Sequence, residues 1–531
     1  MILDDTPDRL GPLTEGAALA LDELAERDAV ARAWAGDHTL WREDPTEVAD
    51  RLGWLSVAPD MAARLDGLQA ECHALAGRSD HVLLMGMGGS SLFPEVVARS
   101  TAAGAEAAGV SPASPAAAPP PGGWPALAVL DTTDPATVAR VGAERAPDRT
   151  LHIAASKSGT TLETRSHLAW AWDRHPDPGR FAVITDPGSE LATLAADARY
   201  AARWENPPDI GGRYSALSLF GLVPALLAGA DVGGLLASAT AMGDRLRSSP
   251  PANPAARLAA TMAAGVRSGR DKLTILVPES VAGFGLWLEQ LVAESTGKDG
   301  TGVVPVVGEA VAGPESYGDD RVFVALGDHP GLDALADAGH PVTVLPCEGA
   351  LADLGGQILL WELATALCGA LLGIQPFDQP DVASAKAATA RVLERGEADE
   401  VPLTPLAELL GTVRPGDYVA IQAFVDPGGP AAPRLEDVRQ ALRDRLRVAT
   451  TLGFGPRFLH STGQLHKGGP GTVVCVQAVG GDPDDVPVPG AGYGFSQLKR
   501  AQADGDLAAL RERGRRAGRV VLDELLEAGP G

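Results

Sequence analysis

Cysteine and lysine are both scarce in this chain of 531 residues, and so is positive charge. Its four cysteines lie far apart, so their spacing fits neither a zinc site nor a disulfide framework. We therefore expect buried, reduced thiols, no metal and a cytoplasmic location. The formal net charge of −25 argues against nucleic acid or an acidic membrane surface as the main partner.

Long hydrophobic runs are also missing. No apolar stretch reaches the ~20 residues that cross a bilayer, and the acidic N-terminus does not look like a signal peptide. We therefore expect no membrane partner. With 45% hydrophobic residues the chain is able to bury a large core, and its length predicts two to four domains at roughly 150 residues each.

The few lysines are concentrated in particular motifs. Only six lysines occur among 44 basic residues, and four of them lie in glycine- and hydroxyl-rich segments: Lys157, Lys298, Lys386 and Lys467. A composition that otherwise uses arginine indicates that these positions need a compact ammonium group.

Strand-like and helical segments alternate along the chain, which predicts βαβ units around parallel sheets. We expect an α/β protein with two tandem doubly wound domains. The candidate strands are residues 80–86, 126–130, 151–155 and 181–185 in the first domain, and 272–278, 302–307, 321–326 and 341–345 in the second.

These segments suggest four regions. They are an N-terminal helical segment (1–48), two α/β domains (49–230 and 231–398) and a smaller C-terminal α/β extension (399–531). In the extension we expect strands at 417–424 and 472–478, a helix at 435–450 and mostly helix over 497–526.

The most informative stretch follows the strand at 151–155. Ser156-Lys-Ser-Gly-Thr-Thr161 offers hydroxyl groups, a lysine and a glycine just before a helix-forming segment. Free backbone N–H groups at a helix N-terminus bind anions. The pattern therefore predicts a loop that holds a phosphate monoester.

Four further segments have chemistry-bearing residues at turns. Gly86-Met-Gly-Gly-Ser-Ser91 follows a buried strand but lacks the third spaced glycine of a dinucleotide-binding loop, so we expect no dinucleotide cofactor. In Asp209-Ile-Gly-Gly-Arg-Tyr-Ser215, two glycines permit a tight turn before Arg213. Glu294-Ser-Thr-Gly-Lys-Asp-Gly300 closes a helix, and Phe377-Asp-Gln-Pro-Asp-Val-Ala-Ser-Ala-Lys386 is the last of the four.

Together and in this order, these motifs resemble the phosphoglucose isomerase family, whose fold consists of sugar isomerase (SIS) domains. The resemblance covers residues 80–390 and implies interconversion of glucose 6-phosphate and fructose 6-phosphate through a cis-enediol, in glycolysis and gluconeogenesis and without a cofactor. The implied catalytic residues are Glu294 as base, Arg213 for the negative charge and Lys386 at the ring oxygen or C1 hydroxyl. The implied binding residues are Ser156, Lys157, Ser158, Thr161 and Gln379 for the phosphate, and Gly89 and Ser90 for the sugar.

A second acidic residue, Glu289, lies five positions before Glu294 on the same expected helix. Because side chains five residues apart point in different directions, we expect only one of the two to reach the site.

One family residue has no counterpart in the expected place. The family's ring-opening histidine, donated by the neighbouring subunit, is replaced by isoleucine in Gly356-Gln-Ile358. A later stretch, Phe458 to Gly469, resembles the C-terminal part of the isomerase module of bacterial transaldolase/phosphoglucose isomerase fusions, and we expect the free-standing form of that module. His466 is our candidate for the missing group and His460 the alternative, since imidazole titrates near neutral pH. The resemblance also implies a homodimer.

Two other functions stay open at this point. One is a bifunctional phosphoglucose/phosphomannose isomerase, which uses the same enediol chemistry. The other is a non-catalytic sugar-phosphate-binding SIS protein, in which Glu294, Arg213 and Lys386 would have no reason to occur together.

Overall fold

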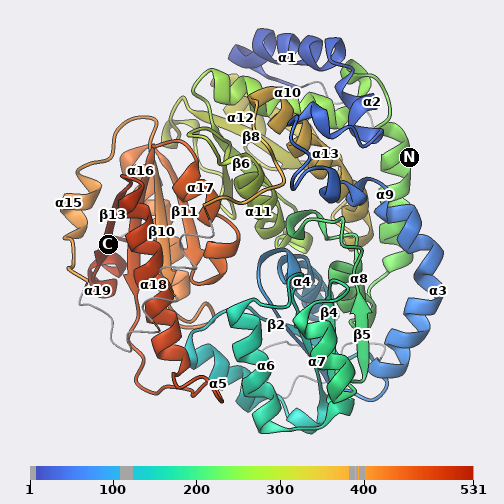
Figure 1. Ribbon diagram of the computed structural model, residues 1–531. Helices are drawn as coiled ribbons and strands as arrows, with labels where there is room; N and C mark the ends of the chain where they lie inside the picture. The colour runs from blue at the N-terminus through green and yellow to red at the C-terminus, as the bar shows by residue number, and fades with distance from the viewer. Residues whose placement is uncertain (1–7, 108–122, 382–388, 390–392, 394–400, 530–531) are drawn as a thin grey trace.

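The computed structural model describes residues 8–107, 123–381, 389, 393 and 401–529. Its described part contains three parallel β-sheets, each flanked by helices, and the three units meet near the centre of the molecule (Figure 1). Every strand pair is parallel, so the predicted α/β class with parallel sheets is confirmed.

The first unit is built on a five-stranded sheet with the order β2-β1-β3-β4-β5. Nearly all residues of β1, β3 and β4 are buried because helices cover both faces, which explains why these segments read as continuous apolar runs. The strands are β1 (His81–Gly86), β2 (Ala126–Leu130), β3 (Thr150–Ala155), β4 (Phe181–Thr185) and β5 (Ala202–Glu205). The helices are α3 (Val57–Ala76), α4 (Leu92–Ala107), α5 (Pro135–Glu144), α6 (Leu162–Arg174), α7 (Glu190–Ala198) and α8 (Leu219–Leu227).

The second unit repeats this plan with the order β7-β6-β8-β9. Its strands are β6 (Lys272–Leu276), β7 (Val304–Val307), β8 (Arg321–Leu326) and β9 (Val342–Leu345). Its helices are α9 (Val232–Arg245), α10 (Pro254–Arg267), α11 (Phe284–Thr296), α12 (Leu332–Asp337) and α13 (Leu354–Leu372).

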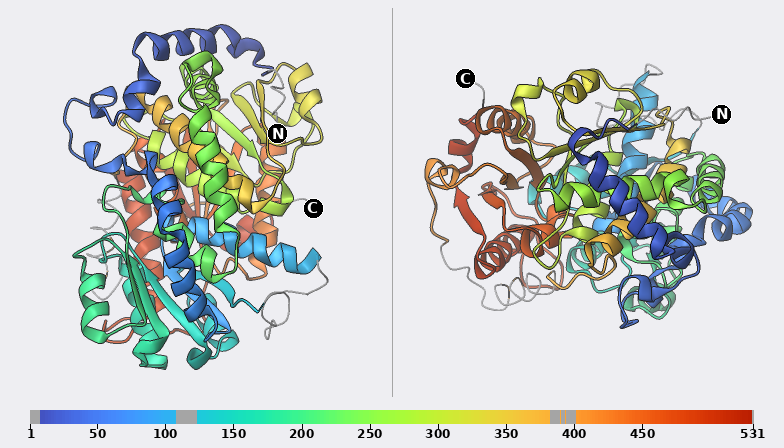
Figure 2. Two further views of the ribbon diagram at one scale, coloured as in Figure 1. Left: turned by 90° about the vertical axis from the view of Figure 1, so that its right-hand side faces the viewer. Right: turned by 90° about the horizontal axis from the view of Figure 1, so that it is seen from above.

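Two groups of helices join these units. The N-terminal helices α1 (Thr14–Glu26) and α2 (Ala29–Trp34) belong to the second unit's side of the molecule, where α1 packs on α10. Helix α3 packs against α8 and α9 and so runs along the junction of the first two units (Figure 1, Figure 2).

The C-terminal unit departs from our expectation, because it holds a complete four-stranded sheet with the order β11-β10-β12-β13. The helix expected to reach residue 450 ends at Leu446, where Arg447 takes a left-handed conformation with φ 55°, and β11 begins at Ala449. The expected helix over 497–526 is interrupted by β13, whose alternating polar sequence suits the edge of a sheet. The elements are β10 (Tyr418–Phe424), β11 (Ala449–Phe454), β12 (Val473–Val479), β13 (Arg516–Val520), α15 (Leu406–Leu410), α16 (Ala431–Leu446), α17 (Gly463–Gly468), α18 (Phe495–Glu512) and α19 (Leu522–Leu526).

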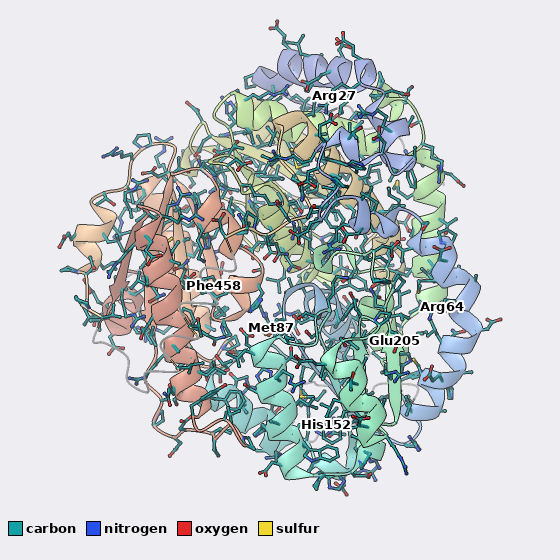
Figure 3. The ribbon with its side chains drawn as sticks, in the orientation of Figure 1. Arg27, Arg64, Met87, His152, Glu205 and Phe458 are labelled. Atoms are coloured by element: carbon teal, nitrogen blue, oxygen red, sulfur yellow. The ribbon has the colours of Figure 1, made fainter. Side chains whose placement is uncertain are left out.

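Viewed from above, this C-terminal unit lies to one side of the other two (Figure 2). Met87, just after β1, and Phe458, just after β11, mark the two sides of the junction between the first and C-terminal units (Figure 3).

Helix α13 is long and apolar, and residues Leu351–Leu372 are long and apolar enough to cross a membrane by length and composition. Our expectation that no segment has this character was therefore wrong. The apolar window is entirely buried inside the protein, because α13 packs against α9, α10 and α11. A helix that is hydrophobic on all sides is typical of such a core position.

One acidic side chain, Glu362, lies within this helix. It is fully buried, and neither carboxyl oxygen has a hydrogen-bond partner among the residues that the structure describes. Burial raises its pKa well above the ordinary value.

Replacing this carboxyl with a thioether of similar volume, Glu362→Met, is expected to raise the free energy of unfolding at neutral pH by about 1–3 kcal/mol, because an unsatisfied polar group leaves the core. A raised pKa in the folded state means that wild-type stability falls as the pH rises above the ordinary pKa of 4.5. The gain is therefore larger at pH 7 than at pH 4, measured by urea unfolding. Leu363→Met on the same helix is the control, and a less stable Glu362→Met protein at pH 7 would contradict the prediction.

Candidate active site

A cleft of about 520 Å³ opens where the three units meet. Its walls come from the N-terminal segment, the turns after β1, β3, β4 and β5, the end of α11, the loop after α13 and the turn after β11. In doubly wound sheets with this strand order, ligands bind outside the carboxyl ends of the first and third strands. The predicted residues Gly89, Ser90, Lys157, Ser158, Thr161, Arg213, Glu294 and Gln379 all line this cleft.

The hydroxyl-rich loop between β3 and α6 is held in shape by its own side chains. The Ser156 and Thr161 hydroxyl oxygens lie 2.9 Å apart, and Gly159 N–H donates to the Ser156 hydroxyl at 3.2 Å. Gly159 has φ +74°, and a Cβ there would lie 2.9 Å from the Leu191 backbone nitrogen, so this position requires glycine. Ser156 is buried behind the loop, and it organises the turn without lining the cleft.

The Lys157 side chain is held beside this loop by two hydrogen bonds. Its ammonium group donates to the Asp186 carboxylate and, at 2.7 Å, to the Pro208 carbonyl oxygen. The N-terminus of the 13-residue helix α6 lies directly after the loop, with its first N–H groups unused by the helix itself. Hydroxyl groups, a lysine and a helix N-terminus therefore gather at one end of the cleft, as an anion-binding site requires.

The first glycine loop touches the arginine turn. A Cβ at Gly89 would lie 1.9 Å from the carbonyl oxygen of Gly212, so the two backbones approach too closely for any side chain. The turn Gly212–Tyr214 carries Arg213, whose side chain is only 2% exposed. The missing side chain at Gly89 thus determines where the guanidinium lies.

Arg213 and Glu294 face each other at the floor of the cleft. The Arg213 Nη1 atom lies 3.7 Å from Glu294 Oε2, and the Glu294 side chain is also only 2% exposed. The other Arg213 nitrogens donate to the Ser295 hydroxyl at 2.9 Å and to the carbonyl oxygens of Pro376 and Asp378 at 2.7 and 2.8 Å. The guanidinium is therefore fixed.

Burial gives Glu294 the properties of a base that works near neutral pH. It raises the pKa of Glu294 to about 7, and the nearby Arg213 charge opposes this shift. Among the described residues, the hydrogen bonds to its carboxylate are long and come from the side-chain amides of Gln290 at 3.3 Å and Gln379 at 3.4 Å. Glu289 is also buried but does not line the cleft, so one of the two acidic residues reaches it, as expected.

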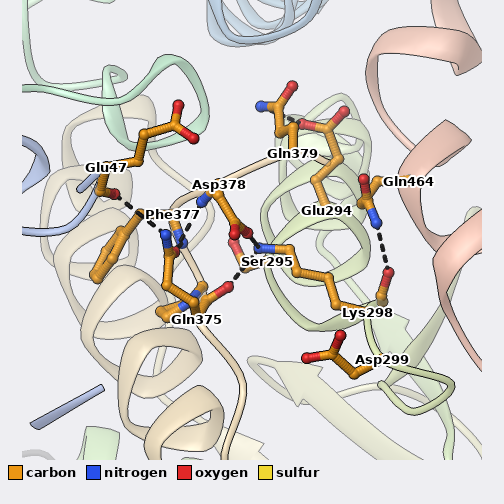
Figure 4. A network of polar contacts seen from close by, with 12 residues as sticks. Glu47, Glu294, Ser295, Lys298, Asp299, Gln375, Phe377, Asp378, Gln379 and Gln464 are labelled. Carbon is orange, nitrogen blue, oxygen red and sulfur yellow. Dashed lines mark hydrogen bonds and ion pairs between the residues drawn. The ribbon is translucent and has the colours of Figure 1, made fainter. Parts of the chain in front are cut away.

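A polar network under the cleft positions Gln379 (Figure 4). Lys298 donates to the Gln375 carbonyl oxygen at 2.6 Å and lies 2.8 Å from Asp378 Oδ1. The Asp378 N–H donates to Gln375 Oε1 at 2.8 Å, which closes the loop on itself. Burial lowers the pKa of Lys298 to about 7. Gln379 leaves this loop toward Glu294, and Figure 4 shows their polar ends together.

The structure does not place His466 at the cleft. This residue lies on α17, is 4% exposed and is not among the residues that line the cleft. The Gln422 amide donates to its Nδ1 at 3.1 Å, and burial lowers its pKa to about 3. The imidazole packs in the core between Tyr418 and Phe458, away from the residues that line the cleft.

The alternative, His460, does line the cleft. It ends the turn η13 (Arg457–His460) of the C-terminal unit, and its Nε2 lies 2.9 Å from Glu163 Oε1. Its carbonyl oxygen accepts a hydrogen bond from Gln290 at 2.6 Å, which places the turn beside α11. Lys386, the remaining predicted catalytic residue, lies outside the described residues.

Several residues that line the cleft, or that contact a residue lining it, could not be predicted from the sequence. Glu163 is in the first turn of α6, directly after the phosphate loop, and that position was the one signal available for it. Glu47 and Arg51 come from the N-terminal segment, where nothing in the sequence pointed to the cleft. Among the residues that the structure describes, no group of three or more His, Cys, Asp or Glu side chains is placed to hold a metal ion.

Comparison with known proteins gives consistent matches. The family model described as phosphoglucose isomerase matches residues 69–320. The glucose-6-phosphate isomerase of Thermosynechococcus vestitus is 30% identical over 442 residues, which is 72% of this chain and 80% of that protein. The enzyme of the same name from Synechococcus elongatus is 29% identical over 486 residues, or 80% and 86% of the two chains.

Solved structures share the fold. A hypothetical protein from Thermus thermophilus superposes with a TM-score of 0.60 at 23% identity, over 73% of this chain and all of that one. A glucose-6-phosphate isomerase from Chlamydia trachomatis gives a TM-score of 0.57 at 17% identity, over 72% and 86% of the chains. With the sequence matches above, these findings show that the chain belongs to the phosphoglucose isomerase (glucose-6-phosphate isomerase) family.

Proposed function

We propose that this protein interconverts glucose 6-phosphate and fructose 6-phosphate in the cleft, through a cis-enediol intermediate. The observation that carries the proposal is the buried Glu294–Arg213 pair, which shares one cleft with the hydroxyl-rich loop after β3. A carboxylate that moves a proton, a cation for the negative charge and an anchor for a phosphate are the groups that this isomerisation needs.

The phosphate binds at the loop Ser156–Thr161 and the N-terminus of α6. Ser158, Thr161 and Lys157 face the anion, Ser156 holds the loop, and Gln379 lies across the cleft. The net charge of −25 disfavours anions in general, so binding depends on this local set of donors. Holding the remote phosphate uses binding energy to orient C1 and C2 at Glu294.

Glu294 takes the proton from C2 of the opened aldose and returns it to C1. Charge develops on the oxygens of the enediol during this step, and Arg213 is already fixed next to the carboxylate by its bonds to Ser295 and the 376–378 backbone. A preorganised cation in a buried site stabilises such charge without reorganisation. The proton moves between adjacent carbons of one molecule, so no hydride leaves the sugar.

His460 takes the role of the ring-opening acid and base that we first gave to His466. A carboxylate only accepts hydrogen bonds, so the 2.9 Å contact with Glu163 Oε1 puts a proton on His460 Nε2 and leaves Nδ1 to exchange a proton with the sugar. Because His460 lines the same cleft as Glu294, this assignment takes the ring-opening group from the same chain. The homodimer implied by the resemblance stays a prediction, as does the ring-oxygen role of Lys386.

The enzyme's setting is part of the same proposal. All four cysteines are free thiols, which fits a reducing cytoplasm and a glycolytic role. Adding mannose 6-phosphate to the assay below decides the bifunctional alternative.

The first test is Glu294→Gln, which keeps the shape of the side chain and removes the proton acceptor. We expect kcat to fall on the order of 10³-fold or more, with binding of fructose 6-phosphate largely kept. Turnover is followed by a glucose-6-phosphate dehydrogenase-coupled assay, and binding by calorimetry. Glu289→Gln, an equally buried carboxyl on the same helix, is the matched control. Near-normal turnover in Glu294→Gln would refute the base.

The pH profile gives a second test. Glu294 accepts a proton only when ionised, and burial raises its pKa to about 7. We therefore expect kcat/KM to fall about tenfold per pH unit below pH 7. Phosphate monoesters titrate near 6, so the inhibition constant of sorbitol 6-phosphate over the same range reports the phosphate alone. If kcat/KM instead falls only below pH 5, Glu294 behaves as an ordinary, solvated carboxyl group.

The third test is Gly89→Ala, which forces a methyl group against the Gly212 carbonyl oxygen. The turn that carries Arg213 has to shift, and we expect turnover to fall on the order of a hundredfold. Gly67→Ala on α3 is the control, because nothing lies within 4 Å of a Cβ there, and it stabilises the helix by about 1 kcal/mol. Equal activity of the two variants would contradict the close approach.

A further inference from the structure

Besides His460, the C-terminal unit has a second side chain that contacts Glu163 of the first unit. Helix α18 carries Gln502, whose side-chain amide donates to Glu163 Oε1 at 2.6 Å. The same carboxyl oxygen accepts a hydrogen bond from His460 Nε2 at 2.9 Å. Two side chains of the C-terminal unit, from different elements, therefore meet on one oxygen atom of the first unit.

The orientation of Gln502 is fixed by a second hydrogen bond. The Thr133 hydroxyl donates to Gln502 Oε1 at 2.6 Å, and this amide oxygen can only accept. The amide NH₂ group must therefore point the other way, toward Glu163. Thr133, Glu163 and Gln502 are all buried. In this buried setting each of the three hydrogen bonds has one fixed donor and one fixed acceptor: Thr133 donates to Gln502, and Gln502 and His460 both donate to Glu163.

The first residue of the turn that carries His460 also bonds to the first unit. Arg457 begins η13 and donates from Nε and Nη2 to the two carboxyl oxygens of Asp131 at 2.8 and 2.7 Å. Asp131 directly follows β2, so the first unit holds both ends of this four-residue turn. Small displacements of η13 are thereby suppressed.

We propose that Gln502 and Thr133 are positioning residues for ring opening: they orient Glu163, which in turn holds the tautomer and the place of His460. The proposal rests on the isomerase function proposed above and extends it to α18. The proposal makes the C-terminal unit part of the catalytic apparatus. Ring opening then depends on Thr133, Gln502, Glu163 and His460, whereas proton transfer between the carbons depends on Glu294.

The experiment compares a ring-forming substrate with one that cannot close. Fructose 6-phosphate closes its ring through the hydroxyl at C5, whereas 5-deoxyfructose 6-phosphate lacks that hydroxyl and stays open. Turnover of the first is measured by the coupled assay. For the second, exchange of the C1 hydrogen with deuterium from the solvent is followed by NMR, and that exchange needs Glu294 but no ring opening.

Gln502→Leu and Thr133→Val are expected to lower kcat on fructose 6-phosphate on the order of tenfold to a hundredfold, since small misplacements of catalytic groups have effects of this size. Both variants should leave exchange on the open substrate nearly unchanged, as should the reference variant His460→Asn. Gln477→Leu is the matched control. Gln477 is a buried glutamine of the same unit whose side chain bonds to the Ala503 carbonyl oxygen and to Arg519 rather than to Glu163, and its loss should not change the ratio of the two rates.

Equal losses on both substrates, or no loss on fructose 6-phosphate, overturn the positioning role. If Gln502→Leu does not fold, Thr133→Val alone decides, because it removes one hydroxyl and keeps the side-chain volume. A wild-type protein that fails to equilibrate the two hexose phosphates instead overturns the proposed function, so the two failures are distinguishable.

Discussion

The close approach of Arg213 to Glu294, 3.7 Å between two nearly inaccessible side chains, is the constraint on which the rest of the site depends. A carboxyl group buried without a cation would stay protonated at neutral pH, and one in full ionic contact would be too weak a base. At this separation burial and attraction oppose each other, and the pKa of Glu294 settles at about 7. The distance between Arg213 and Glu294 is kept by the contact between Gly89 and Gly212, by the 375–379 loop and by the hydrogen bond of Arg213 to Ser295.

Three sheets with one strand order bring this pair and its partners together. The phosphate loop and the first glycine loop leave the ends of β3 and β1, which flank the point where the strand order reverses. The second unit adds Glu294 at the end of a buried helix, and the third adds His460 on a turn after β11. Each unit supplies what its own topology places at this edge, so the cleft exists only when all three are docked.

Local patterns in the sequence predicted a large part of this arrangement. Gly159, Gly89 and the Arg213 turn were recognisable because each lies in a short motif of glycines and polar residues, although the contacts that require Gly159 and Gly89 are with Leu191 and Gly212, far along the chain. The choice between His460 and His466 was not recognisable, since the two lie six residues apart and differ only in which unit they face. Gln502 and Arg457 carried no local signal, because their partners are more than 300 residues away along the chain. The third sheet was missed in part because β11 and β13 are short edge strands without continuous apolar runs.

The interface of the C-terminal unit combines an apolar cluster, in which Val304 and Val306 join Tyr418 and Ala420, with buried polar contacts that fix the position of the unit. Beside the Arg457–Asp131 pair, Lys499 of α18 donates to Asp134 at 2.9 Å, and Arg443 of α16 lies 3.1 Å from Glu309, both in buried positions. Buried ion pairs add little net stability, because desolvation offsets their attraction. Their geometry does exclude alternative registers, since a shift leaves charges buried and unpaired. An apolar interface would hold this unit as firmly but would tolerate sliding, and sliding by about 1 Å is enough to take His460 away from Glu163. The docked position of the C-terminal unit is thus specified by the same kind of directional contact that the chemistry in the cleft requires.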